Sequence, residues 1–131
     1  MYSIEKVNFN DSVEIKKLLM NSKSIAVSKG KLLQEILMHI GNEDSVAMKI
    51  TKDGRIFGVW LSKEFKKHTS LSYFFISEEL RLQRIVLEFF IKCTILINKD
   101  KPIIITTKDT TGFDRYVEKI NDTQYLFKGF R

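Results

Sequence analysis

Residues 76–90 join the end of an apolar strand to a long amphipathic helix, and this joint restricts the possible folds more than any other segment. It reads Ile76-Ser-Glu-Glu-Leu-Arg-Leu-Gln-Arg-Ile-Val-Leu-Glu-Phe-Phe90. In many α/β enzymes such a joint cradles a phosphate on backbone N–H groups of the helix N-terminus, and glycines let the ligand approach them. Positions 82–86 contain no glycine. The sequence therefore has the layout of a phosphate site without its usual residues.

The rest of the chain alternates between strand and helix periodicity. Asp53-Gly54 is a strong tight-turn signal, so the apolar runs on either side of it should form an antiparallel hairpin. Four helices are predicted: one capped by Asp11 with Glu14 as in a capping box, one from Ser28 to Gly41, one from Ser77 to about Ile97, and a short one over 111–120. Runs of β-branched and aromatic residues predict strands over 3–7, 46–50, 56–61, 71–76, 103–107 and 124–128.

This order predicts an α/β (α+β) fold that forms a single domain over residues 1–131. The elements run β-α-α-β-β-β-α-β-α-β, which gives a mixed, mostly antiparallel sheet of about six strands with helices on both faces. The strand-helix-strand unit from Leu71 to Thr107 should place its two strands parallel, with a right-handed crossover.

The composition is that of an ordinary globular protein with a basic surface. The net charge of +6 comes from 22 basic and 16 acidic side chains, and the lysines stand in ones and twos, which favours a solvated surface over a dedicated nucleic-acid site. Cys93 is the only cysteine, so an internal disulfide is excluded, and its apolar surroundings predict a buried, inert thiol. Since neither a transmembrane span nor a signal peptide is predicted, we expect a cytoplasmic protein.

The order of the elements and several residue strings resemble the GCN5-related N-acetyltransferase (GNAT) superfamily over nearly the whole chain. Asp53-Gly-Arg-Ile-Phe-Gly-Val-Trp60 is similar to a family hairpin, and Ile76-Ser-Glu-Glu-Leu-Arg81 to the segment before the acetyl-CoA loop. Ser3 to Leu19 resembles the opening strand and helix, and Tyr116-Val-Glu-Lys-Ile120 resembles a string near the family's end. The resemblance implies a GNAT-like fold.

Two departures from the family pattern imply a degenerate member. A Gly-x-Gly-x-Gly run would follow Arg81 in the family and bind the cofactor's pyrophosphate, but this chain has Leu82, Arg84 and Val86 at those glycine positions. The family's thiolate-protonating tyrosine aligns with Val117; Tyr116, one residue earlier, would point elsewhere on a helix. These departures predict that no cofactor is bound, with acetyl-CoA as the alternative.

No catalytic or metal-binding residue is assigned from the sequence. Glu64, His68, Glu78 and Glu79 are candidate bases, but none belongs to a recognisable catalytic constellation, and no cluster has metal-ligand spacing. Arg81 and Arg84 form a candidate residual anion site at the start of the long helix. In the alternative interpretation both arginines pair with Glu78, Glu79 or Glu88 on the helix surface.

Three functions follow from the sequence. The first is a catalytically degenerate GNAT-fold module that binds other proteins. Small lysine- and isoleucine-rich chains of this kind resemble acetyltransferase-like proteins of tailed bacteriophages, which implies phage structural proteins as partners and a virion or host-cytoplasm location. The second is a divergent acetyl-CoA-dependent N-acetyltransferase. The third is a small basic regulator associated with nucleic acid.

Overall fold

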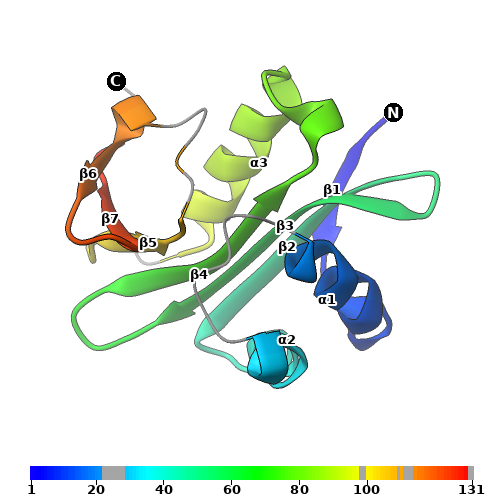
Figure 1. Ribbon diagram of the computed structural model, residues 1–131, viewed down its shortest axis with the longest axis horizontal. Helices are drawn as coiled ribbons and strands as arrows, with labels where there is room; N and C mark the ends of the chain where they lie inside the picture. Colours follow the sequence, from blue (N-terminus) through cyan, green and yellow to red (C-terminus); the bar gives the residue numbers. More distant parts are fainter. Residues whose placement is uncertain (22–28, 98–99, 109, 111–113, 130–131) are drawn as a thin grey trace.

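The computed structural model describes residues 1–21, 29–97, 100–108, 110 and 114–129. These residues form a seven-stranded sheet of order β1-β2-β3-β4-β5-β7-β6 (Figure 1). β4 and β5 are parallel, as predicted, and the other neighbouring strands are antiparallel. The strands are β1 (Ser3–Lys6), β2 (Ser45–Lys52), β3 (Arg55–Glu64), β4 (Thr69–Ile76), β5 (Ile103–Thr106), β6 (Val117–Lys119) and β7 (Gln124–Phe127).

Helices cover both faces of the sheet, which confirms the predicted fold class. Helices α1 (Ser12–Met20) and α2 (Leu32–Ile40) lie on one face, and α3 (Arg84–Ile95) lies on the other (Figure 1). Among the described residues, no helix combines the length and apolar character needed to cross a membrane. Short 3-10 turns complete the described structure: η1 (Phe9–Asp11), η2 (Lys29–Lys31), η3 (Glu78–Leu80) and η4 (Asp114–Tyr116).

A β-bulge in β4 reverses which face of the sheet the side chains of its second half point to. Leu61 of β3 pairs with Tyr73, whereas the next residue, Ser62, pairs with Leu71, so Ser72 is the extra residue. A bulge of this kind reverses the alternation of side chains. Leu71 therefore packs in the core under α3, and Tyr73 packs in the core under α1 and α2.

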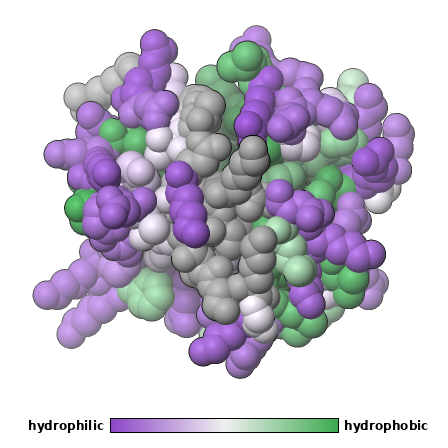
Figure 2. Space-filling view, in the orientation of Figure 1, coloured by the Kyte–Doolittle hydropathy of each residue, from purple (hydrophilic) through white to green (hydrophobic). Residues whose placement is uncertain are grey.

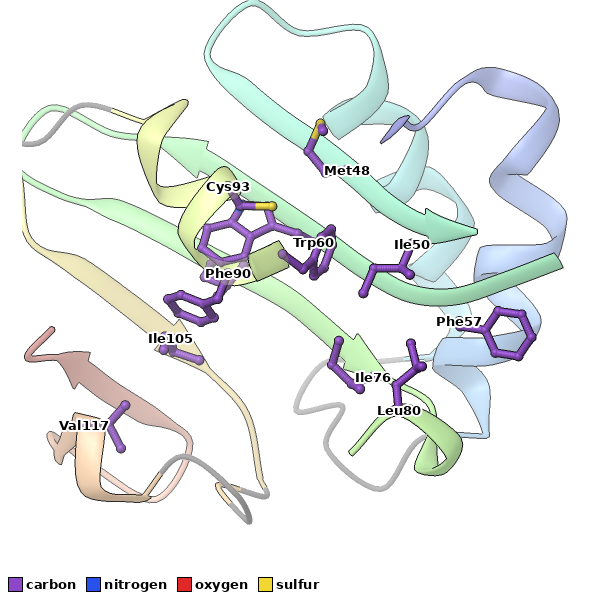
Figure 3. Packing of buried hydrophobic residues seen from close by; sticks show 12 residues of the cluster. Met48, Ile50, Phe57, Trp60, Ile76, Leu80, Phe90, Cys93, Ile105 and Val117 are labelled. Carbon is purple, nitrogen blue, oxygen red and sulfur yellow. The ribbon is translucent and has the colours of Figure 1, made fainter. Parts of the chain in front are cut away.

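The core under α3 is rich in aromatic rings. Trp60 is fully buried, and its ring makes edge-on contacts with Phe74 and Phe90, at centroid distances of 6.0 and 5.0 Å. The indole Nε1 donates a hydrogen bond of 2.8 Å to Ser62 Oγ, which satisfies the one polar atom of the ring. Figure 3 shows Trp60 and Phe90 beside Cys93, between the sheet and α3.

The core under α1 and α2 is mainly aliphatic and is tied by polar links. Lys49 Nζ on β2 lies 2.7 Å from Asp11 Oδ2, and both side chains are largely buried. Glu14 Oε2 accepts a hydrogen bond of 2.9 Å from the Ile56 N–H. The predicted capping box is therefore wrong, because both carboxylates are engaged away from the helix end and Asp11 instead forms a capping box with Asn8.

One predicted helix start and one predicted helix are also wrong. The long helix begins at Arg84 and not at Ser77, because η3 and a turn come between β4 and α3. The helix predicted over 111–120 is replaced by η4 and β6 in its described part; residues 111–113 lie outside the described residues, as does Ser28, the predicted start of α2. The extra strand β6 explains why the sheet has seven strands rather than about six.

Candidate functional site

The sheet parts in its middle, where β4 and β5 stop pairing. The parallel ladder joins only Thr69 to Ile103, Ser70 to Ile104 and Leu71 to Ile105. Beyond Leu71, β4 stays with β3 up to Ile76, while β5 continues with β7. Figure 3 shows the two strands diverging, with Ile76 on one and Ile105 on the other. The end of β4 that leads to α3 is therefore separated from β5.

A tight turn connects this end of β4 to α3. The Gln83 N–H donates to the Leu80 carbonyl at 2.9 Å, and Arg81 has φ −57° and ψ 135°. Leu82 has a φ of 73°. These values define a type II turn, whose third position requires a left-handed backbone and therefore favours glycine. The chain keeps a glycine-type backbone at position 82 although the residue is leucine.

The N-terminus of α3 offers backbone donors at the end of this turn. Gln83 is the N-cap residue, but its side chain makes no capping hydrogen bond and instead donates to the Glu79 carbonyl at 2.7 Å. Within the part of the chain that the structure describes, the N–H groups of Arg84 and Ile85 have no acceptor. Such N–H groups, together with the helix dipole, favour an anion at this place.

The side chains that replace the expected glycines do not fill the turn. Leu82 is 99% exposed, and the side chain of Arg84 also extends into solvent. Val86 faces the other way and packs against the core under α3. Two of the three side chains therefore lie in solvent, and the third lies against the core.

The two predicted anion-site arginines both lie at the turn, and both are exposed. Arg84 Nε lies 3.8 Å from Glu88 Oε1, which is the surface pairing foreseen as the alternative. This pair is long and solvated, and it contributes little to stability. An anion-binding role for Arg81 and Arg84 stays a prediction.

The four candidate bases lie at the two ends of β4. Glu78 and Glu79 form the first residues of η3, next to the turn. Glu64 and His68 belong to the opposite end, where Glu64 pairs with Lys101 at 3.2 Å and the His68 ring stacks on Phe65. Only the two η3 carboxylates therefore accompany the N-terminus of α3.

A buried Tyr-His pair beneath the parting strands escaped the sequence analysis. Tyr73 is the only ionisable residue of the β4 segment 72–76, and its ring lies 6.0 Å from His39 of α2, edge to face. Burial, and then the negative charge of Glu35, raises the pKa of Tyr73 to about 12. His39 Nδ1 lies 2.7 Å from the Glu35 carbonyl oxygen, and burial lowers the pKa of the imidazole. Strand alternation alone places Tyr73 on the other face, so the bulge hid this pair.

Two other sequence arguments can now be assessed. Val117 is buried and belongs to strand β6, so the argument that Tyr116 points elsewhere on a helix does not apply. Cys93 is fully buried, as predicted, and burial raises the pKa of its thiol to about 12. Among the described residues, no group of three or more His, Cys, Asp or Glu side chains could hold a metal ion.

Comparison with known proteins gives the fold but no close relative. No family model and no curated protein matches the sequence. A GNAT-family acetyltransferase from Staphylococcus aureus Mu50 superposes with a TM-score of 0.77, 14% identity and 98% coverage of both chains. PaiA N-acetyltransferase from Thermoplasma acidophilum, in complex with coenzyme A, gives 0.69, 15% and 96% of both chains. A GNAT-family acetyltransferase from Brucella melitensis, in complex with acetyl-CoA, gives 0.66 and 13%, covering 98% of this chain and 89% of that one.

These complexes overturn one prediction and confirm another. The prediction, drawn from the missing glycines, that no cofactor is bound is contradicted by proteins of the same fold, two of which hold coenzyme A or acetyl-CoA. Of the three positions where glycines were expected, Leu82 keeps the left-handed backbone that glycine would favour, with a φ of 73°. The predicted architecture is confirmed over nearly the full chain. The chain has the fold of the GNAT acetyltransferases.

Proposed function

We propose that this chain binds an acyl-CoA and transfers the acyl group to an amine, as a divergent N-acetyltransferase. One observation carries the proposal: a type II turn and the N-terminus of α3 follow the end of β4 that is separated from β5. The occurrence of coenzyme A and acetyl-CoA in proteins of the same fold supports it.

The turn would hold the negatively charged part of the cofactor. The N–H groups of Arg84 and Ile85 supply donors, and the exposed Arg81 and Arg84 guanidinium groups add positive charge. The extended arm of the cofactor would lie where the β4–β5 ladder ends. In this arrangement the backbone N–H groups and the two guanidinium groups would make the contacts to the cofactor.

Acyl transfer needs an unprotonated amine and a proton for the leaving thiolate. When bound, acetyl-CoA supplies a thioester whose C–S bond breaks as the N–C bond forms. The Tyr73 phenol remains protonated at neutral pH because its pKa is about 12, so it is the candidate proton donor. The amine proton would pass to solvent water, because Glu78 and Glu79 lie beside the turn rather than at the end of the cofactor arm.

Calorimetric titration with acetyl-CoA and with CoA tests the binding step. Arg81→Ala and Arg84→Ala should each weaken binding about tenfold, since each removes a charged partner of the phosphates. Lys17→Ala is the matched control, because it removes one positive charge from α1 on the other face of the sheet. Leu82→Gly should leave binding unchanged or tighten it, since the leucine side chain lies in solvent.

Transfer is tested separately from binding. Release of the CoA thiol in the presence of primary amines should fall in Tyr73→Phe, while the affinity for acetyl-CoA stays the same. An absence of binding at about 1 mM ligand would refute the proposal. It would leave two predictions: the protein-binding module, with phage structural proteins as partners, and the small basic regulator associated with nucleic acid.

A further inference from the structure

Helix α3 carries a row of large apolar side chains on the side that faces away from the sheet. Leu87, Ile91 and Ile95 are 44%, 40% and 60% exposed, and they follow one another at intervals of four residues. The opposite side of the same helix buries Phe89, Phe90 and Cys93. We call the outward row, Leu87, Ile91 and Ile95, the α3 ridge.

The α3 ridge is not required to close the core. A surface helix normally presents polar residues to solvent, so a three-membered apolar row on the outer face marks an interaction surface. α3 lies on the outside of the sheet, away from α1 and α2 (Figure 1). Hydrophilic side chains cover most of the molecular face in Figure 2, with separate apolar areas between them.

Charged residues flank the ridge on one side only. Each helical residue turns by 100°, so Glu88 and Lys92 lie about 60° and about 100° round the helix from Ile91, in the same direction. Glu88 lies about 4.5 Å before Ile91 along the helix axis, and Lys92 lies about 1.5 Å after it. Both side chains are exposed.

This arrangement is complementary to itself. If a second copy packs its α3 ridge antiparallel against the first, with Ile91 on the two-fold axis, the charged sides of the two helices meet. Glu88 of one copy then lies within about 3 Å, along the axis, of Lys92 of the other, and the pairing occurs twice. The antiparallel orientation also sets opposite ends of the helix dipoles side by side.

From this complementarity we infer that the α3 ridge is a homodimer interface, formed by an antiparallel pair of α3 helices. A second copy fits better than a lipid surface because it pairs both Glu88 and Lys92, whereas an anionic membrane would attract Lys92 and repel Glu88. Three turns of helix bury a small area, so the dimer is a weak one. The inference goes beyond the proposed transferase function and does not depend on it.

Sedimentation velocity over a range of protein concentrations, up to about 1 mM, tests the interface. The unmodified chain should show a reversible monomer–dimer equilibrium. Ile91→Asp places two like charges on the two-fold axis and should weaken dimerisation about 100-fold. Met38→Asp, on the exposed surface of α2, is the matched control and should leave the equilibrium unchanged.

A charge exchange tests the proposed antiparallel register. Glu88→Lys and Lys92→Glu should each weaken dimerisation about tenfold, because like charges then face each other twice. The double exchange should restore it, since each new lysine meets a new glutamate. Circular dichroism confirms that each variant is folded.

Three results would overturn the inference. A chain that stays monomeric throughout the range, a dimer that Ile91→Asp does not affect, or a double exchange that fails to restore pairing would each do so. Co-flotation of the monomer with vesicles of phosphatidylcholine and phosphatidylserine, lost in Ile91→Asp, would assign the ridge to a lipid surface instead.

Discussion

The two faces of the sheet are packed with different kinds of side chain. Under α3, rings meet rings: Trp60, Phe74 and Phe90 contact one another without an ionisable group between them. Under α1 and α2, aliphatic side chains form the core, and charged or titratable groups such as Lys49 and His39 are buried with them. The second face therefore contains a histidine whose pKa is lowered by burial, whereas the three rings named on the first face carry no ionisable group.

The two cores also position different parts of the molecule. The aromatic core lies beneath the helix that carries the candidate cofactor turn, so dense packing fixes the position of the turn. The polar links instead connect segments distant in sequence: Asp11 with Lys49, and Glu14 with the backbone of Ile56. Such links fix how α1 sits on the sheet. Removing one group from each face would show whether the two roles are distinct.

The largest effect is expected from Trp60→Ala. The substitution leaves a cavity among buried rings and leaves the Ser62 hydroxyl without its donor, so the free energy of unfolding should fall by about 3–5 kcal/mol. Urea denaturation measures the change. Ser62→Ala is the control and should cost much less, because it removes the polar partner without emptying the core. A loss below about 1 kcal/mol for Trp60→Ala would show that this face is loosely packed.

A smaller loss is expected when the ion pair on the other face is broken. Lys49→Met leaves the Asp11 carboxylate with the Asn8 N–H as its one donor among the described residues, and it should cost about 2–3 kcal/mol. Asp11→Asn and the double variant complete a thermodynamic cycle. Coupling of about 1–2 kcal/mol is expected between the two sites. If the two single losses simply add, the pair does not hold α1 on the sheet.

The smallest effect concerns pH. Burial lowers the pKa of His39 below its usual 6.5, with Glu35 opposing and Lys63 adding to the shift. Below pH 6.5 the unfolded chain therefore binds more protons at this residue than the folded chain does. The stability associated with neutral His39 is complete above that pH and is lost as the pH falls toward the folded-state pKa.

His39→Phe should reduce this loss. The ring contact with Tyr73 is kept and the titration is removed, so stability should fall less between about pH 7 and about pH 5 in the variant than in the unmodified chain. Urea denaturation at both pH values gives the comparison. An equal fall in both proteins would mean that carboxylates elsewhere carry the whole acid response.

Local sequence patterns predicted most of the elements. The Asp53-Gly54 turn fixed the β2–β3 hairpin, with φ of 52° and 75° at the two residues, and the β-branched run at 103–106 gave β5. The long helix was found because its apolar side is strongly periodic. Its true start was missed because Ser77, Glu78 and Glu79 are good helix-start residues, although here they begin a 3-10 turn.

The candidate site could be located from sequence but not judged from it. The sequence places Arg81 and Arg84 correctly at the turn. The direction of the Leu82 side chain depends on the positive φ of this residue, which the residue pattern does not predict. Leucine at a positive φ costs on the order of 1–2 kcal/mol. Because of this cost, a leucine at position 82 does not predict a left-handed backbone there. Tyr73 was missed for a related reason, since a bulge decides its face.

The extra residue at Ser72 restricts which insertions and deletions this chain can accept during evolution. Removing or adding one residue anywhere between Leu71 and Tyr73 would not be a local edit, because all of β4 that follows would exchange its inward and outward neighbours. Phe74 would leave the rings under α3, and Tyr73 would leave His39. This stretch can therefore accept point substitutions, whereas insertions and deletions would disrupt the packing on both faces of the sheet.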